Sequence, residues 1–99
     1  MKRIDLIDVN TAQRRSETLK ALGHPVRLRI IDLLNTGEHN VGQIAETLDM
    51  KSAIISQQLK ILRLSGLVEV DKRDGHSFYR ISNIHLPRLL DCLRSCDQY

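Results

Sequence analysis

The stretch from residue 41 to residue 80 constrains the fold of this chain more than any other part. Two amphipathic segments are separated by the short turn Asp49-Met50-Lys51, and Gly66 ends the second of them. Two segments of strand composition follow, Leu67–Val70 and Phe78–Ile81, with Asp74-Gly75 between them. An Asp-Gly pair between strand-like segments is a strong hairpin signal. The order predicts a helix-turn-helix (residues 41–65) followed by a β-hairpin wing (residues 67–82), with a long, projecting loop at residues 72–77.

Helix signals also occur on both sides of this stretch. Asn10 or Thr11 is expected to cap a first helix that ends at Gly23, and Pro25 suits the first turn of a second. Asn40 and Gln43 have the spacing of a capping box for the third helix. A last helix is expected to start between residues 82 and 85 and to reach about residue 96. The fold class is therefore mainly α, with about five helices and a small β-hairpin.

Composition limits the class of protein further. The 99 residues fit one domain, residues 1–99, and a 41% apolar content with few aromatics implies an aliphatic core. The net charge of +3 permits nucleic-acid binding without arguing for it. No apolar run could span a membrane, and the N-terminus does not resemble a signal peptide. Two cysteines are too few for a disulfide scaffold, so we expect a reducing, cytoplasmic location.

The fourth helix has a polar face whose chemistry suits DNA. No acidic residue occurs from Met50 to Val68, whereas a generic solvated face mixes both signs of charge. Short hydroxyls and an amide near the helix start can approach base edges, and cations further along can contact phosphates. Gln58 is an exception, because it falls on the apolar side. The candidate DNA-contacting residues are Lys51, Ser52, Ala53, Ser56, Gln57, Lys60 and Arg63 in this segment, with Lys72, Arg73 and His76 in the wing.

Simpler interpretations exist for both features. The fourth helix could be an ordinary amphipathic surface helix, and the wing tip could be a solvated turn whose positive field Asp71 and Asp74 dilute. Within the wing, Arg73 is the best candidate for contact with a minor groove or its phosphates.

Several segments together resemble the ArsR-type family of bacterial winged-helix repressors. The resemblance covers roughly residues 12–96 and includes Leu19–Leu34, Val41–Leu48, Ser56–Arg63, Gly66-Leu67-Val68 and the hairpin from Gly75 to Tyr79. It implies a homodimer joined through the first and last helices (residues 1–22 and 82–99), which binds double-stranded operator DNA and leaves it when an effector binds. Lys51 stands where the family often has a capping Ser or Thr, so Asp49 or Ser52 is expected to cap the reading helix.

The sequence indicates the effector less clearly than it indicates the DNA-binding surface. The thiol metal site that the resemblance implies on the third helix has no cysteine here, and of the site on the last helix only His85 matches outright. His85, Cys92 and Cys96 lie on one helical stripe, and two antiparallel copies could bring them to a zinc-like or softer ion. Cys92 and Cys96 could instead form a thiol switch, or simply pack at a dimer contact. Thiol-sensing relatives pair a cysteine on the second helix with one on the last helix, and the second helix here has no cysteine.

These observations favour a sequence-specific DNA-binding repressor. The alternative is a winged-helix module that binds another protein and no DNA, which the modest net charge would suit. An enzyme is not expected, because the sequence has no nucleophile–base pair, phosphate-binding loop or paired carboxylates at meaningful spacing.

Overall fold

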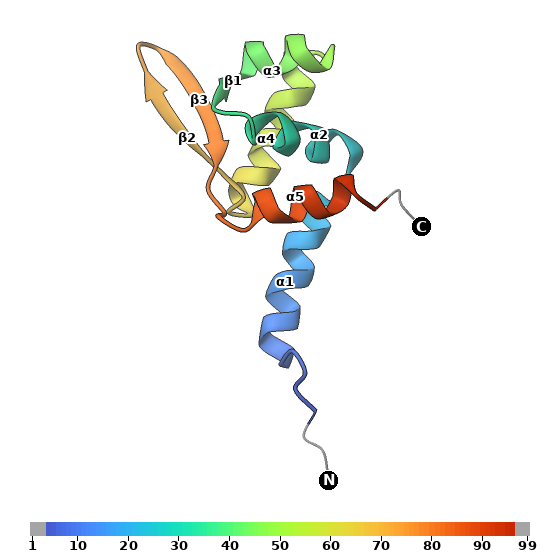
Figure 1. The fold of residues 1–99 in the computed structure, drawn as a ribbon. Helices are drawn as coiled ribbons and strands as arrows, with labels where there is room; N and C mark the ends of the chain where they lie inside the picture. The colour runs from blue at the N-terminus through green and yellow to red at the C-terminus, as the bar shows by residue number, and fades with distance from the viewer. Residues whose placement is uncertain (1–3, 97–99) are drawn as a thin grey trace.

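A computed structural model describes residues 4–96 and confirms the predicted class (Figure 1). Five helices surround a small core, and a three-stranded antiparallel sheet extends from it as the wing. The ends of the two expected dimerisation segments, residues 1–3 and 97–99, lie outside the described residues. In the part that is described, no helix combines the length and the apolarity needed to cross a bilayer. The elements are α1 (Val9–Leu22), α2 (Pro25–Leu34), β1 (His39–Asn40), α3 (Val41–Leu48), α4 (Ser52–Leu64), β2 (Val68–Arg73), β3 (His76–Ile81) and α5 (Leu86–Arg94).

Helix α1 begins earlier than the sequence suggested. Asp8, and not Asn10 or Thr11, caps it, because the Asp8 carboxylate accepts a 2.7 Å hydrogen bond from the Thr11 backbone N–H. This hydrogen bond lowers the pKa of Asp8 below its ordinary value. Gly23 ends the helix as expected, and Pro25 then occupies the first turn of α2.

The link from α3 to α4 is set by local backbone chemistry. Both hydrogen bonds of the predicted capping box are present: the Asn40 side chain accepts from the Gln43 N–H at 2.8 Å, and the Gln43 side chain accepts from the Asn40 N–H at 2.9 Å. At the other end of α3, Asp49 adopts a left-handed conformation with φ of 54°. Asp tolerates this conformation better than most residues, and it ends the helix abruptly. The turn that follows delivers the chain directly into α4.

The wing differs from the prediction in its loop. Arg73 pairs with His76 and Lys72 with Ser77, so the strands continue to a two-residue turn at Asp74-Gly75 and no long loop projects. Both turn residues have positive φ (52° and 78°), the geometry that suits the right-handed twist of a hairpin. A short strand that the sequence analysis missed, β1, adds to the other side of β3, giving the order β1-β3-β2.

The core is aliphatic, as the composition predicts, and draws on every helix. Helix α1 contributes only its end, and the rest of it projects from the body (Figure 1). Leu19 on α1 and Leu93 on α5 are 58% and 43% exposed. The buried residues are Ala21, Leu22, Ile30, Ile31, Leu34, Ile44, Ala45, Leu48, Ile55, Leu59, Leu62, Leu67, Val68, Leu86 and Leu90.

Helix α5 crosses the body beside the base of α1 (Figure 1). It ends at Arg94, earlier than the expected boundary, so Cys96 lies in the turn beyond it. Arg94 forms ion pairs with Asp32 on α2 and with Asp91 one turn before it. The pair with Asp32 joins the end of the last helix to α2.

Candidate DNA-binding surface

Helix α4 begins without a side-chain cap. Lys51 is the N-cap residue, and neither Asp49 nor Ser52 takes the capping role that we expected of them. Asp49 cannot do so because it closes the preceding helix, and Ser52 already has helical geometry. The first N–H groups of α4 therefore have no side-chain acceptor from the cap residue, which leaves an electropositive helix start next to the Lys51 ammonium.

The buried side of α4 is narrower than the apolar arc in its sequence. Ile55, Leu59 and Leu62 are fully buried, whereas Ile54 and Ile61 are 38% and 39% exposed. The two exposed isoleucines lie at the edge of the polar arc, where the core no longer covers them.

Gln58, the polar residue on the inner side, has a structural explanation. Its Oε1 accepts a 3.1 Å hydrogen bond from Arg27 Nη1, and Arg27 Nε also donates to the Ala21 carbonyl at 2.6 Å. Gln58 thereby joins α4 to α2 and to the end of α1. Sequence patterning does not reveal this contact, because the two residues are 31 positions apart.

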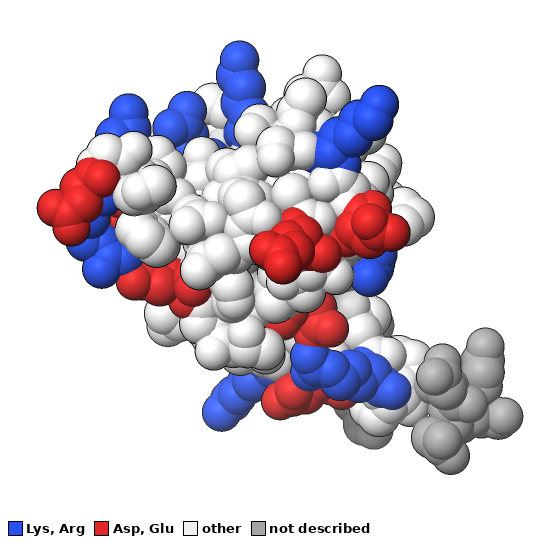
Figure 2. Space-filling model, turned by 90° about the horizontal axis from the view of Figure 1, so that it is seen from above, with Lys and Arg blue, Asp and Glu red and all other residues white. Residues whose placement is uncertain are grey.

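The opposite side of α4 is open to solvent along its length. Within residues 4–96, none of the three cations of this segment, Lys51, Lys60 and Arg63, takes part in an ion pair. In the view from above, the upper edge carries Lys and Arg side chains with no Asp or Glu among them, while other Lys and Arg side chains lie beside the Asp and Glu lower in the view (Figure 2). Exposed together on this helix and its cap are Lys51, Ser52, Ala53, Ser56, Gln57, Lys60 and Arg63.

In the wing, Arg73 is engaged within the chain. Its guanidinium hydrogen-bonds Glu38, lies 3.4 Å from the Asp71 carboxylate and stacks 4.4 Å above the Phe78 ring. The hydrogen bond to Glu38 raises the pKa of Arg73 above its ordinary value. Arg73 must therefore leave these partners before it can contact a phosphate.

The other wing cations divide into paired and unpaired ones. Arg80 binds Glu69 at 2.7 Å across the two strands and lies 3.9 Å from Asp71, so the wing's acids are largely neutralised by its own arginines. Lys72 and His76 are exposed, and Lys72 forms no ion pair in the described part of the chain. Lys72 is thus the better placed of the wing's candidate contacts.

The candidate effector residues do not form a metal site in one chain. Among the described residues, no three His, Cys, Asp or Glu side chains gather closely enough to hold an ion. His85 precedes the first turn of α5, where its N–H donates to the Asn83 side chain at 2.9 Å. Cys92 and Cys96 are both free and exposed, and the Cys96 thiol lies 3.3 Å from the Cys92 carbonyl oxygen. Cys92 lies within the last turn of α5, and Cys96 lies just after the helix ends.

Comparison with known proteins identifies the family of this chain. The model of the "Bacterial regulatory protein, arsR family" matches residues 24–70, which include α2, α3, α4 and the start of the wing. The biofilm growth-associated repressor of Agrobacterium fabrum is 37% identical over 75 residues, or 76% of this chain and 64% of that protein. The repressor of the same name from Xylella fastidiosa is 35% identical over 82 residues, or 83% of this chain and 72% of that protein.

Solved structures share the fold across most of the chain. HlyU from Vibrio cholerae superposes with a TM-score of 0.82 at 30% identity, covering 93% of this chain and all of that one. The repressor BigR from Xylella fastidiosa gives 0.80 at 34% identity, covering 85% of this chain and 86% of that one. A homodimeric winged helix-turn-helix DNA-binding domain from Mycobacterium bovis gives 0.78 at 31% identity, covering 93% of this chain and 87% of that one.

Fold and surface together define a winged helix-turn-helix transcriptional regulator of the DNA-binding kind. The chain belongs to the arsR family of bacterial regulatory proteins. This family consists of regulators and not of enzymes.

Proposed function

We propose that this protein represses transcription by binding an operator as a homodimer, with α4 in the major groove. The observation that carries the proposal is the solvent face of α4, where hydroxyls, an amide and unpaired cations lie together in a segment without acids. In helix-turn-helix proteins the second helix of the pair enters the groove, and α4 is that helix.

The contacts divide by chemistry. Ser56 and Gln57 have short polar side chains that reach base edges, and Gln can form a paired hydrogen bond with adenine. Lys60 and Arg63 lie further along the same face and hold the register through phosphates. Lys51 and the uncapped start of α4 supply a further phosphate site, and Ser52 and Ala53 leave room for close approach. In the wing, Lys72 and His76 reach the neighbouring backbone, and Arg73 joins them if it exchanges Glu38 for a phosphate.

Exposed apolar side chains support the homodimer. Val9 on α1 is 84% exposed, and Leu19 and Leu93 are also exposed, on the two helices that we expect to dimerise. The segment before α1 adds Ile4, Leu6 and Ile7. Apolar surface of this extent is costly in water and is typical of a subunit interface. A twofold dimer would present two copies of α4 to a palindromic operator.

The alternative, a module that binds only proteins, is less well supported. Its one argument was the modest net charge, but Glu69 and Asp71 in the wing are paired with the wing's own arginines, whereas within residues 4–96 the cations of α4 form no ion pair. Relatives that are named repressors also favour DNA.

The test is a gel-shift titration of the full chain with fragments that contain the region upstream of its own gene. We expect one fragment to bind with an affinity that falls steeply as salt rises, because phosphate contacts release counterions. Absence of salt-sensitive binding to every fragment would overturn the proposal in favour of the protein-binding module.

The second part of the proposal is that the effector acts by oxidising the two cysteine thiols. A metal ion as the effector fits the structure less well. Cys92 lies in the last turn of α5 and Cys96 just beyond it, so a bond between the two exposed thiols requires the end of α5 to unwind. Peroxide would oxidise the two thiols to a disulfide and be reduced to water. Within one described chain, His85 and the two cysteines do not form a metal-binding group, so we route no step through a metal.

Operator release by peroxide distinguishes a thiol switch from inert packing. We expect release of the reduced wild type and no release of the Cys92→Ser and Cys96→Ser variants, because each lacks one partner of the bond. If all three proteins respond alike, the thiols are not the sensor. Adding zinc or cadmium in parallel tests the metal alternative with the same variants.

A further inference from the structure

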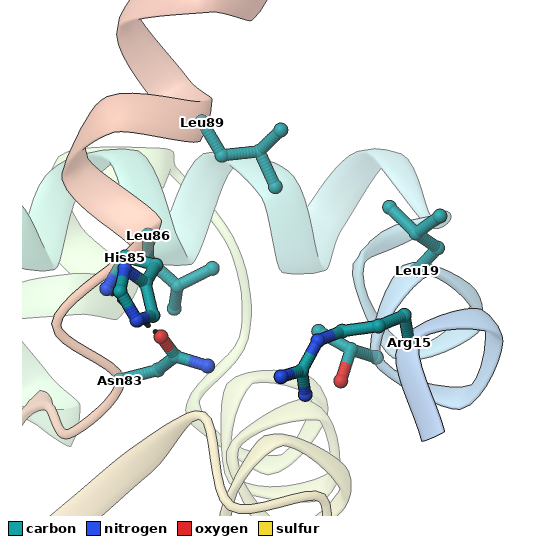
Figure 3. A pocket seen from close by; sticks show the side chains of 7 residues that line it. Arg15, Leu19, Asn83, His85, Leu86 and Leu89 are labelled. Atoms are coloured by element: carbon teal, nitrogen blue, oxygen red, sulfur yellow. Dashed lines mark hydrogen bonds between the residues drawn. The ribbon is translucent and has the colours of Figure 1, made fainter. Parts of the chain in front are cut away.

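A pocket separates α1 from the segment that links the wing to α5 (Figure 3). Its volume of about 310 Å³ is at the lower end of the range for small-molecule sites. No residue of α4 is among its lining residues, which are Arg15, Thr18, Leu19, Asn83, His85, Leu86 and Leu89.

The polar groups of this pocket are mainly donors. The Arg15 and Asn83 side chains extend toward one another across it (Figure 3). Arg15 forms no ion pair within the described part of the chain. The Asn83 Oδ1 is already used by the His85 backbone N–H, which leaves the amide NH₂ free to donate. An exposed guanidinium beside an amide donor and an imidazole is an arrangement suited to an anion.

Among residues 4–96, no carboxylate lines the pocket, and this favours a negatively charged ligand. His85 had been a candidate metal ligand, but here it shares its pocket with a guanidinium, which repels a cation. A metal ion would also find no second strong ligand in the wall, since Thr18 and Asn83 offer only neutral oxygen. The charge and donors of the lining both favour an anion over a metal.

The remaining wall is apolar, which favours an organic ligand over an inorganic ion. Leu86 is buried, Leu89 is half-buried, and Leu19 closes the α1 side. A strongly hydrated inorganic anion gains nothing from such a surface, whereas an aromatic or aliphatic group is stabilised by it. The volume admits a group of about the size of a benzene ring with a short substituent.

We propose that this pocket binds a small organic carboxylate, with the carboxylate at Arg15 and Asn83 and the apolar part against Leu86 and Leu89. The ligand would join α1 to the residues directly after β3, and thereby couple the projecting helix to the wing. This part rests on the proposed function: because α1 and α5 carry the proposed dimer contacts, occupancy would change the spacing of the two α4 helices and so the affinity for the operator.

Calorimetric titration of the full chain, without DNA, tests the site. The probes are benzoate and hexanoate as carboxylates, benzamide as a neutral molecule of the same shape as benzoate, and inorganic phosphate. We expect the two carboxylates to bind saturably with Kd values of about 1 mM or below. Benzamide should bind at least about tenfold more weakly, because it lacks the charge that Arg15 pairs with.

Arginine variants locate the binding. Arg15→Gln should weaken benzoate about tenfold and leave benzamide little changed. Arg14→Gln is the matched control, since Arg14 is the neighbouring exposed arginine on α1 and does not line this pocket. Benzoate binding that is absent, equal to that of benzamide, or insensitive to Arg15→Gln would overturn the site. Equal binding of phosphate would overturn its organic character.

Repeating the gel shift with saturating benzoate separates this inference from the proposed function. If DNA binds and benzoate changes its affinity several-fold only when Arg15 is present, the coupling holds. If DNA binds and benzoate binds without effect on DNA, the regulatory part is wrong. Benzoate binding to a chain that binds no DNA would refute the proposed function alone.

Discussion

Lys60 and Arg63 are proposed to contact phosphates, a role that is distinct from recognition of the DNA base sequence. Both are exposed on α4, and neither is engaged by an acid within residues 4–96. Their long side chains are free to follow a phosphate backbone, but they carry no information about base identity when they do so.

Replacing either cation should weaken binding to all DNA sequences to a similar degree. For Lys60→Gln and for Arg63→Gln, we expect the slope of log affinity against log salt to flatten by about one unit per lost phosphate contact. Arg88→Gln, which removes an exposed cation from α5, is the control and should leave the slope unchanged. A full-strength slope in both α4 variants would show that these side chains do not touch phosphates.

At the residue scale, the sequence predicts which side chains are exposed better than it predicts their partners. The polar face of α4 follows from a 100° helical step, so its exposed residues could be predicted one by one. The pairing of Arg73 with Glu38 could not, because it depends on how β1 and the wing come together. The prediction that Asp49 or Ser52 caps α4 is wrong. Asp49 adopts the left-handed conformation that ends α3, so it cannot also cap the next helix.

At the scale of elements, α4 has two tasks on opposite sides. Ile55 is fully buried in the core, while its neighbour Ile54 is 38% exposed at the edge of the proposed DNA face. Helix patterning alone assigned both to the apolar side. The structure separates them because the core covers a narrower arc than the apolar residues occupy.

Two isoleucine-to-alanine variants test this division. Ile55→Ala should lower the free energy of unfolding by about 2–5 kcal/mol, since it leaves a cavity among Leu59, Leu62 and their neighbours. Ile54→Ala is the matched control and should cost about 1 kcal/mol or less. Urea denaturation of both variants measures the difference, and equal costs would contradict the arrangement of α4 in the core.

Elements with strong local signals were predictable, and those that depend on distant pairing were not. The capping box at Asn40 and the Asp74-Gly75 turn act over a few residues, and both predictions are confirmed in type. The strand β1 has two residues and exists only because β3 lies beside it. The wing loop was expected to be longer because the sequence alone does not show that residues 72 and 73 stay paired.

At the scale of the whole molecule, a monomer does not account for the exposed apolar side chains of α1. It projects from the body with apolar residues exposed, and Leu93 on α5 is 43% exposed as well (Figure 1). The resemblance to the ArsR-type family predicts that these two helices join the subunits, but the pattern of the sequence does not show which apolar side chains stay exposed. A second copy of the chain would account for both surfaces at once.

Introducing a charge at this surface should separate the subunits. We expect Leu93→Glu to weaken the dimer at least about tenfold, because the carboxylate would be buried without a partner. Ile54→Glu, on a similarly exposed isoleucine of α4, should leave the dimer intact. Sedimentation equilibrium of both proteins gives the dissociation constants. Unchanged association of the Leu93 variant would place the interface elsewhere.

The central claim is that the outward face of α4 reads base sequence, and Gln57 tests it most directly. The measurement is the affinity of wild type and of Gln57→Ala for the operator and for a set of operators with single base-pair changes, at one salt concentration. We predict that the wild type discriminates by about 1–3 kcal/mol at a base pair to which the variant has become indifferent. The same order of preference in both proteins, and also in Ser56→Ala, would contradict the claim.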